Sequence, residues 1–346
     1  MMSTQPGSLM LSEITEIPRV LSELSSSFAS NIEAQQLLRD QKFNSIMLLA
    51  RGTSDNAAHF FKYLIETKLG LPCGLVSPSA ATMYSTKFHY EGTLLIAISQ
   101  SGQSSDLLAF AKAAQAGGGY LLSITNDPSS PLATISDLHI PIGAGPELAV
   151  PATKSYVGQL FVSLLLTDAW AKTGLDRSGI ISASKKCLDD SDLYKTFASS
   201  IDIKRPIYVL GRGFSYPNAK EFALKLQETC LIPVQGMSSS DFLHGPIASL
   251  DRDSQVIFLA PHNLPKASFG EAPARVREVT GRAFWIGSGD FAEKGDVLLE
   301  TPKCGSEVDS CVIDAITFQK VTHQIAVSNN LNPDTPQGLS KVTITR

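Results

Sequence analysis

The segment most informative about the fold is Thr93-Leu94-Leu95-Ile96-Ala97-Ile98-Ser99-Gln100-Ser101-Gly102-Gln103-Ser104. An apolar run ends at Ser99, a short polar turn with one glycine follows, and residues 105–116 have helical spacing. A strand that is apolar on both faces is typical of a parallel sheet covered by helices on both sides. The stretch therefore predicts a strand, a tight turn and a helix of an α/β domain.

The same alternation of strands and helices extends in both directions from this stretch. An amphipathic pattern from Met10 to Leu38 predicts one or two helices ahead of the first strand. The most apolar segment, 156–170, contains Gln159 and Asp168 and is shorter than the ~20 residues that span a membrane, so we expect a buried helix. Further strands are predicted at 46–50, 71–76, 120–125, 138–142, 207–211 and 255–260, and further helices at 57–69, 218–229 and 313–327.

An internal repeat relates the two halves of the chain. Residues 46–54 read Ile-Met-Leu-Leu-Ala-Arg-Gly-Thr-Ser, residues 207–215 read Ile-Tyr-Val-Leu-Gly-Arg-Gly-Phe-Ser, and a helical pattern follows each. Because the repeated unit is a whole domain, we predict two tandem doubly wound parallel-sheet domains with the flavodoxin-like strand order. The second copy has Pro261-His262-Asn263-Leu264-Pro265 after its third strand, so only the first copy keeps a polar turn with glycine there.

These patterns predict the domain organisation. We expect an N-terminal helical segment at 1–38, a first domain at 39–175 and a second domain at 196–330. A polar linker, 176–195, separates the two domains, and the tail at 331–346 contains proline and glycine. The tail is expected to close the active site.

Composition limits the classes of function. The 346 residues are 43% hydrophobic and have a net charge of −4, which fits about two domains and argues against a general nucleic-acid surface. The five cysteines have no metal-ligand spacing, which is typical of reduced thiols in a cytoplasmic protein. The start has no basic segment before an apolar core, so we expect no signal peptide. We expect no metal, no cofactor and no membrane partner.

The polar turn after residue 98 has the features of a phosphate-binding site. It lies at the predicted carboxyl end of a parallel strand, where ligands bind in such sheets, and it begins a helix, whose N–H groups attract anions. Gly102 lets the backbone approach a ligand, and Ser99, Ser101 and Ser104 add hydroxyl donors. Ordinary helix capping by serine is the alternative. Three serines around a glycine favour a binding site for a phosphomonoester over ordinary helix capping.

A second group of residues has the composition of an acid–base site. Glu221, Lys225 and Glu228 share one face of a predicted helix, which for an isolated helix indicates a solvated salt-bridge face. A polar stretch, 235–246, follows and contains His244 just before Gly245-Pro246. A carboxylate and an imidazole are the groups that an aldose–ketose proton shuttle needs. We interpret the other histidines as structural residues, namely His59, His89, His139, His262 and His323.

From residue 43 onward, nearly the whole chain resembles the isomerase half of glucosamine-6-phosphate synthase, in the sugar isomerase (SIS) family. Two motifs are specific, namely the turn at Ser99 and the segment from Glu228 to His244-Gly245-Pro246. The other matching strings are Arg51-Gly52-Thr53-Ser54, Gly145-Pro146-Glu147, Thr153-Lys154-Ser155, Leu224-Lys225-Leu226-Gln227-Glu228 and Gly338-Leu339-Ser340-Lys341-Val342-Thr343.

The resemblance implies a role for each matching residue. Glu228 would move the proton between C1 and C2, His244 would assist ring opening, and Lys341 would reach the sugar carbonyl as an amine or as a charge. Lys225 and Glu221 would hold Glu228 in place. The resemblance also implies a homodimer, in which His244 would complete the partner's site. The phosphate would lie on Ser99, Gln100, Ser101 and Ser104, with Thr53 and Ser54 nearby.

Two departures from the synthase bear on the reaction. The synthase has a glutaminase domain with an N-terminal cysteine nucleophile, whereas residue 2 here is Met2, so we expect no use of glutamine. The family's Ala-Ser-Thr-Lys is Pro151-Ala152-Thr153-Lys154 here, which alters the expected loop contacts to the sugar. The chain looks most like the stand-alone glucosamine-6-phosphate deaminases, which release ammonia from an amino-sugar 6-phosphate.

Three alternatives stay open at this point. The protein could be an aldose–ketose phosphosugar isomerase without amine chemistry, or a fructosamine-6-phosphate deglycase. A non-catalytic sugar-phosphate sensor belongs to a different class. Such a sensor would need the turn at 99–104 but would not need Glu228, His244 and Lys341.

Overall fold

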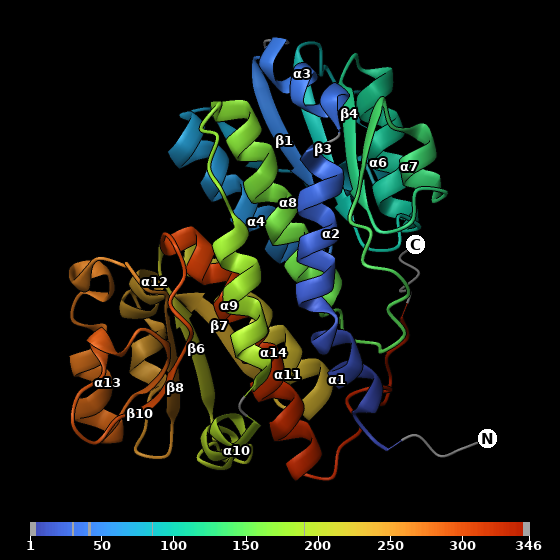
Figure 1. Cartoon of the computed structure of the whole chain (residues 1–346). Helices are drawn as coiled ribbons and strands as arrows, with labels where there is room; N and C mark the ends of the chain where they lie inside the picture. The colour runs from blue at the N-terminus through green and yellow to red at the C-terminus, as the bar shows by residue number, and fades with distance from the viewer. Residues whose placement is uncertain (1–4, 30, 41–42, 85, 190, 342–346) are drawn as a thin grey trace. The chain divides into compact units, whose positions relative to one another are not determined.

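The computed structural model describes residues 5–29, 31–40, 43–84, 86–189 and 191–341 (Figure 1). The chain divides into two compact units, each built around one sheet. We call them the first-sheet unit, Arg19–Glu147, Lys154–Asp176 and Ser340–Arg346, and the second-sheet unit, Met1–Pro18, Leu148–Thr153 and Arg177–Leu339.

The first-sheet unit contains five parallel strands in the order β2-β1-β3-β4-β5. The central strand β3 is buried at every position, because its apolar side chains meet helices on both faces of the sheet. Helices α6 and α7 cover one face, and α4 and α8 cover the other (Figure 1). The strands are β1 (Ser45–Leu49), β2 (Cys73–Leu75), β3 (Thr93–Ser99), β4 (Tyr120–Thr125) and β5 (Leu138–Pro141). The helices are α2 (Ile17–Ala29), α3 (Ile32–Asp40), α4 (Thr53–Leu64) with a π-helical turn at Ile65–Leu69, α5 (Ser79–Thr82), α6 (Ser105–Ala116), α7 (Pro131–Ile135) and α8 (Lys154–Ala171).

The second-sheet unit repeats this strand order. Its parallel strands lie in the order β10-β9-β8-β6-β7, which is the same arrangement when it is read from β7. The prediction of two tandem doubly wound domains is therefore confirmed. The strands are β6 (Ile207–Gly211), β7 (Val234–Ser238), β8 (Gln255–Ala260), β9 (Phe284–Gly287) and β10 (Val297–Glu300). The helices are α1 (Ser8–Thr15), α9 (Ser178–Asp189), α10 (Ser191–Ser199), α11 (Tyr216–Cys230), α12 (Ser239–Leu243), α13 (Ala272–Thr280) and α14 (Glu307–Ser328), with 3-10 turns at Gly213–Ser215, Pro246–Ser249, Lys266–Phe269 and Gly289–Phe291.

Helices α11 and α12 lie on opposite faces of the second sheet. On one side, Gly236 of β7 faces α11 so closely that a β-carbon would collide with the Ala219 carbonyl. On the other side, the neighbouring Met237 packs with Phe242 of α12 in the same apolar cluster. Successive residues of a strand point to opposite faces, so the sheet separates the two helices.

Several segments differ from the sequence predictions. Three N-terminal helices form where one or two were expected, because separate helices begin at Ser8, Ile17 and Ile32. The segment 176–195, expected as a polar linker, forms α9 and the first part of α10, and α9 buries Ile180, Ala183 and Cys187. Strands β7, β9 and β10 were not predicted.

Helix α8 is buried along most of its length, as predicted. Among the helices of the described residues, none has the length and apolar character needed to cross a membrane. All five cysteines are buried free thiols.

Candidate functional site

The polar turn at 99–104 follows β3 directly and is held by its own serines. Ser99 Oγ accepts a hydrogen bond from the Gly102 N–H at 3.1 Å, and Ser101 Oγ accepts one from the Gln103 N–H at 3.3 Å. Gly102 has φ +62°, and a β-carbon there would overlap Ser130. The tight turn therefore requires glycine at this position. The Gln100 carbonyl accepts from the Asn126 N–H at 3.1 Å, which ties the turn to the end of β4.

Ser104 occupies the N-cap position of α6 without acting as a cap. Its backbone has extended angles, but its side chain makes no capping hydrogen bond in the described part of the chain. An ordinary N-cap serine accepts a bond from the first turn of its helix, so capping does not account for this hydroxyl. The side chain is half-buried at the start of α6, which is the positive end of the helix dipole. This arrangement suits an anionic oxygen.

An ion pair that the sequence analysis did not single out joins two neighbouring turns. Arg51 Nε, in the turn after β1, donates to Asp106 Oδ2 in the first turn of α6 at 2.8 Å. The Arg51 side chain is half exposed, whereas Asp106 is buried. The arginine thus balances a carboxylate that would otherwise repel an anion bound at the same helix start. The Arg-Gly pair repeated at 51–52 and 212–213 was the sequence signal for this arginine. Only the fold shows that its partner is Asp106.

Thr53 and Ser54 begin α4, beside the turn at 99–104, but they differ in their surroundings. Ser54 is buried, and its hydroxyl accepts from Gln159 Nε2 of α8 at 2.9 Å. Thr53 is half-buried at the first position of the helix. The structure therefore gives Ser54 a packing role and leaves Thr53 nearer to the surface.

Lys341 is held by a buried glutamate within the first-sheet unit. Lys341 Nζ lies 3.1 Å from Glu147 Oε2 and donates a hydrogen bond to it. Glu147 also accepts from the Ser155 N–H at 3.0 Å and from the Ser155 hydroxyl at 2.7 Å. The Glu147 carboxylate therefore holds the start of α8 and also Lys341, the last residue of the C-terminal tail that the structure describes.

The face formed by Glu221, Lys225 and Glu228 is largely buried, which corrects the solvated face that an isolated helix would give. Lys225 is fully buried, donates a hydrogen bond to Glu228 and lies 3.4 Å from Glu221 Oε1. Burial alone would lower the pKa of Lys225, but the two carboxylates outweigh burial and hold this pKa above its ordinary value. Glu221 is also fully buried, whereas Glu228 keeps 22% of its side chain exposed. Glu228 is thus the member of the group that a ligand can reach.

His244 follows the last residue of α12 as its C-cap and is exposed. Because α11 and α12 lie on opposite faces of the second sheet, Glu228 and His244 do not lie on the same face. The structure brings together Glu221, Lys225 and Glu228 within the second-sheet unit. It separately brings together Thr53, Ser54, Ser99, Gln100, Ser101 and Ser104 at one end of the first sheet.

Comparison with known proteins agrees with this architecture. The sequence matches the SIS domain over residues 37–169 and 201–278. This chain belongs to the SIS family. A curated relative is the glutamine–fructose-6-phosphate aminotransferase (isomerizing) of Pyrococcus horikoshii, with 31% identity over 96% of this chain and 57% of the relative. This SIS chain therefore spans a little over half the length of the curated relatives that it matches.

Solved structures of SIS proteins show the same fold. A candidate phosphosugar isomerase from Silicibacter pomeroyi has a TM-score of 0.82 and 29% identity, with 94% of this chain and 99% of that chain covered. The glucosamine-6-phosphate deaminase of Thermotoga maritima has a TM-score of 0.78 and 20% identity, with 98% and 100% covered. At 20% identity, the second likeness bears on the fold alone.

Proposed function

We propose that this SIS protein is a phosphosugar isomerase of the deaminase type. It would convert glucosamine 6-phosphate, or a related amino-sugar 6-phosphate, to the ketose 6-phosphate and ammonia. The observation that carries the proposal is Glu228, a partly exposed carboxylate oriented by a fully buried lysine. A carboxylate fixed in this way, with one side open, suits proton transfer at a sugar carbon.

The turn at 99–104 would hold the phosphate. The phosphate would contact the Ser101 and Ser104 hydroxyls before the start of α6, with Arg51 beside them. We expect the double variant Ser101→Ala, Ser104→Ala to raise KM for the phosphorylated sugar at least about tenfold, because hydrogen bonds to a charged group are lost. A folded double variant with unchanged KM would place the phosphate elsewhere.

The chemistry would proceed on the open-chain sugar, with His244 assisting ring opening. Glu228 removes the C2 proton of the aldose, giving an enol with a C1–C2 double bond, and returns the proton to C1. The carbon that bears the amine then becomes a C2 imine. Water adds to this imine, and the C2–N bond breaks to give the ketone and ammonia.

Lys341 would act near the carbonyl in one of two ways. In the structure its ammonium is paired with Glu147, which supports a role as a fixed positive charge toward developing negative charge on the sugar oxygen. Exchange with the imine through its own amine would require Lys341 to leave Glu147 and lose a proton. Glu147→Gln separates these roles, because it removes this ion pair and keeps the lysine.

One assay tests the reaction. The purified protein is incubated without glutamine with glucosamine 6-phosphate and, separately, galactosamine 6-phosphate, and ammonia and ketose phosphate are both measured. We expect equal amounts of the two products, and a loss of roughly 10²–10⁴-fold in turnover for Glu228→Gln with Kd nearly unchanged. Ketose phosphate without ammonia would indicate a plain isomerase. Tight binding without turnover of any sugar phosphate would indicate a sensor.

The position of His244 also supports a homodimer in this proposal. Glu228 and His244 lie on opposite faces of the sheet of one chain, and His244 is exposed. An exposed imidazole on the far face is available to a neighbouring copy, so each site would take Glu228 from one chain and His244 from the other.

A further inference from the structure

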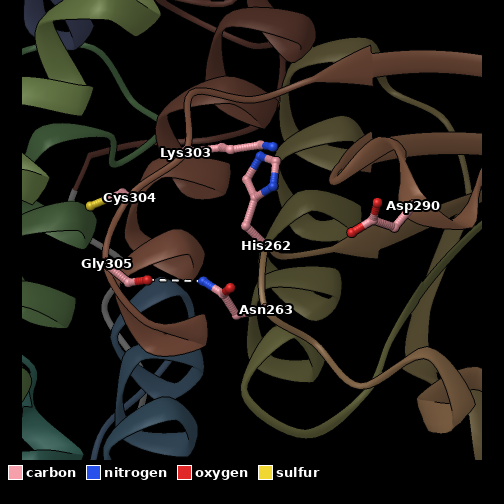
Figure 2. Close-up of a pocket in the computed structure, with 6 residues that line it drawn as sticks. All are labelled: His262, Asn263, Asp290, Lys303, Cys304 and Gly305. Atoms are coloured by element: carbon pink, nitrogen blue, oxygen red, sulfur yellow. Dashed lines mark hydrogen bonds between the residues drawn. The ribbon is translucent and has the colours of Figure 1, made fainter.

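A cavity lies at the carboxyl ends of three adjacent strands in the second-sheet unit. It has a volume of about 340 Å³ and is lined by His262, Asn263, Asp290, Lys303, Cys304 and Gly305 (Figure 2). These residues come from the segments after β8, β9 and β10. In open parallel sheets ligands bind at this edge, and the volume falls in the range of small-molecule sites.

The cavity occupies the place in the second sheet that the phosphate turn occupies in the first. Strand β8 has the position in its sheet that β3 has in the first sheet, and the turn at 99–104 follows β3 directly. His262 and Asn263 follow β8 after a single proline. A histidine replaces the polar serine turn here, and Lys303 from the segment after β10 faces it (Figure 2).

The walls of the cavity are fixed by two hydrogen bonds that join the segments after β8 and β10. His262 Nε2 lies 2.8 Å from the Thr301 carbonyl, and it must be the donor because a carbonyl only accepts. Asn263 Nδ2 donates to the Gly305 carbonyl at 2.9 Å, and Asn263 has the unusual φ of +68° (Figure 2). Together these two bonds hold the segments after β8 and β10 in place around the cavity.

Opposite charges face each other across this fixed space. Figure 2 shows the amino group of Lys303 pointing toward the imidazole of His262, with the Asp290 carboxylate on the other side of the ring. Both charged side chains are exposed, and neither has an ion-pair partner among the residues that the structure describes. The Lys303 ammonium can take an anionic group, and the Asp290 carboxylate can accept hydrogen bonds from hydroxyls.

We propose that this cavity is a second ligand site, separate from the turn at 99–104, that binds a phosphorylated polyol such as a sugar phosphate. The phosphate would contact Lys303 and the hydroxyls would contact Asp290. Its lining residues include no carboxylate oriented by a buried lysine, so we propose binding at this site and no reaction. The proposal does not depend on which reaction the enzyme performs.

Equilibrium dialysis with radiolabelled sorbitol 6-phosphate tests the proposal, because this open-chain polyol phosphate has no carbonyl to react. We expect two molecules bound per wild-type chain. Lys303→Ala should weaken one of the two sites at least about tenfold, since a charged contact to phosphate is lost. Lys294→Ala, at an exposed lysine outside the cavity lining, is the matched control and should still bind two.

The variants separate this site from the proposed active site. Ser101→Ala, Ser104→Ala should remove the other binding event and leave the Lys303 event intact. Asp290→Asn should weaken sorbitol 6-phosphate at the cavity but not inorganic phosphate, which has no polyol hydroxyls. Binding of one molecule per chain that is insensitive to Lys303→Ala would overturn the second site. A single event that Lys303→Ala removes and the serine variant does not would support the cavity and contradict the phosphate turn.

Discussion

Lys225 donates a hydrogen bond to Glu228 from a fully buried position three residues earlier on α11, and it lies 3.4 Å from Glu221 one turn before that. One buried cation thus serves two carboxylates, of which only Glu228 reaches the surface. Removal of the cation would leave uncompensated negative charge inside the unit. Lys225 is therefore a positioning residue for Glu228.

Lys225→Met should destabilise the protein by about 3–5 kcal/mol, the usual cost of breaking a buried ion pair from one side. Urea unfolding measures this loss. Adding Glu221→Gln should recover part of the stability, because one orphaned charge is neutralised. Lys195→Met, at an exposed pair with Asp192, is the control and should change stability by less than about 1 kcal/mol. Equal unfolding midpoints for Lys225→Met and Lys195→Met would contradict the role given to the buried pair.

Gly102→Ala should raise KM for the phosphorylated sugar at least about tenfold, because the added carbon overlaps Ser130 and displaces the turn. Gly70→Ala is the matched control. Gly70 has a similar positive φ, +65°, but a β-carbon there meets no described atom within 4 Å. Gly70→Ala should introduce similar backbone strain but leave KM for the phosphorylated sugar unchanged. A wild-type KM in Gly102→Ala would argue against the turn as the phosphate site.

Mixing two inactive variants should restore activity if His244 serves the partner's site. Glu228→Gln and His244→Asn are each expected to be inactive as pure proteins. A mixed dimer then contains one intact pair, so unfolding and refolding an equal mixture should give about a quarter of wild-type activity. Activity that stays at the level of the separate variants would place both residues in a site of one chain.

Stability should fall as pH rises toward 8, because of Asp314 on α14. Burial raises the pKa of this carboxyl to about 8, against about 3.9 for an unfolded aspartate. Between these values the native state holds a proton that unfolding releases, so the stabilisation present below pH 4 is lost as pH rises through 8. One oxygen accepts from the Thr301 hydroxyl at 2.9 Å, and an asparagine can accept the same bond.

Asp314→Asn should therefore flatten the dependence of the unfolding midpoint on pH between 5 and 8.5, since the amide does not titrate. Thermal unfolding at several pH values measures the slope. Asp192→Asn, at a strongly exposed aspartate, should keep the wild-type slope. The same steep slope in both variants would mean that another group releases the proton.

Local sequence was sufficient to predict a helix or strand where the segment is buried on all sides. Strand β3 is apolar at nearly every position because helices cover both of its faces, and the predicted helix at 105–116 has the observed bounds of α6. The repeat of Arg-Gly-x-Ser after two apolar strands predicted the tandem sheets, since both copies keep the same strand-turn-helix start. The edge strand β7, Val-Gln-Gly-Met-Ser, escaped prediction because an edge strand needs little apolar surface and its glycine is required by contact with α11.

For the candidate site, the spacing of Glu221, Lys225 and Glu228 determined that they share a helix face. Whether this face is buried depends on packing between distant segments, since α14 packs against α11 from far along the chain. The sequence likewise placed His244 only 16 positions after Glu228. Their separation by a sheet follows from the crossover that puts α11 on one face of β7 and α12 on the other, which no local pattern encodes.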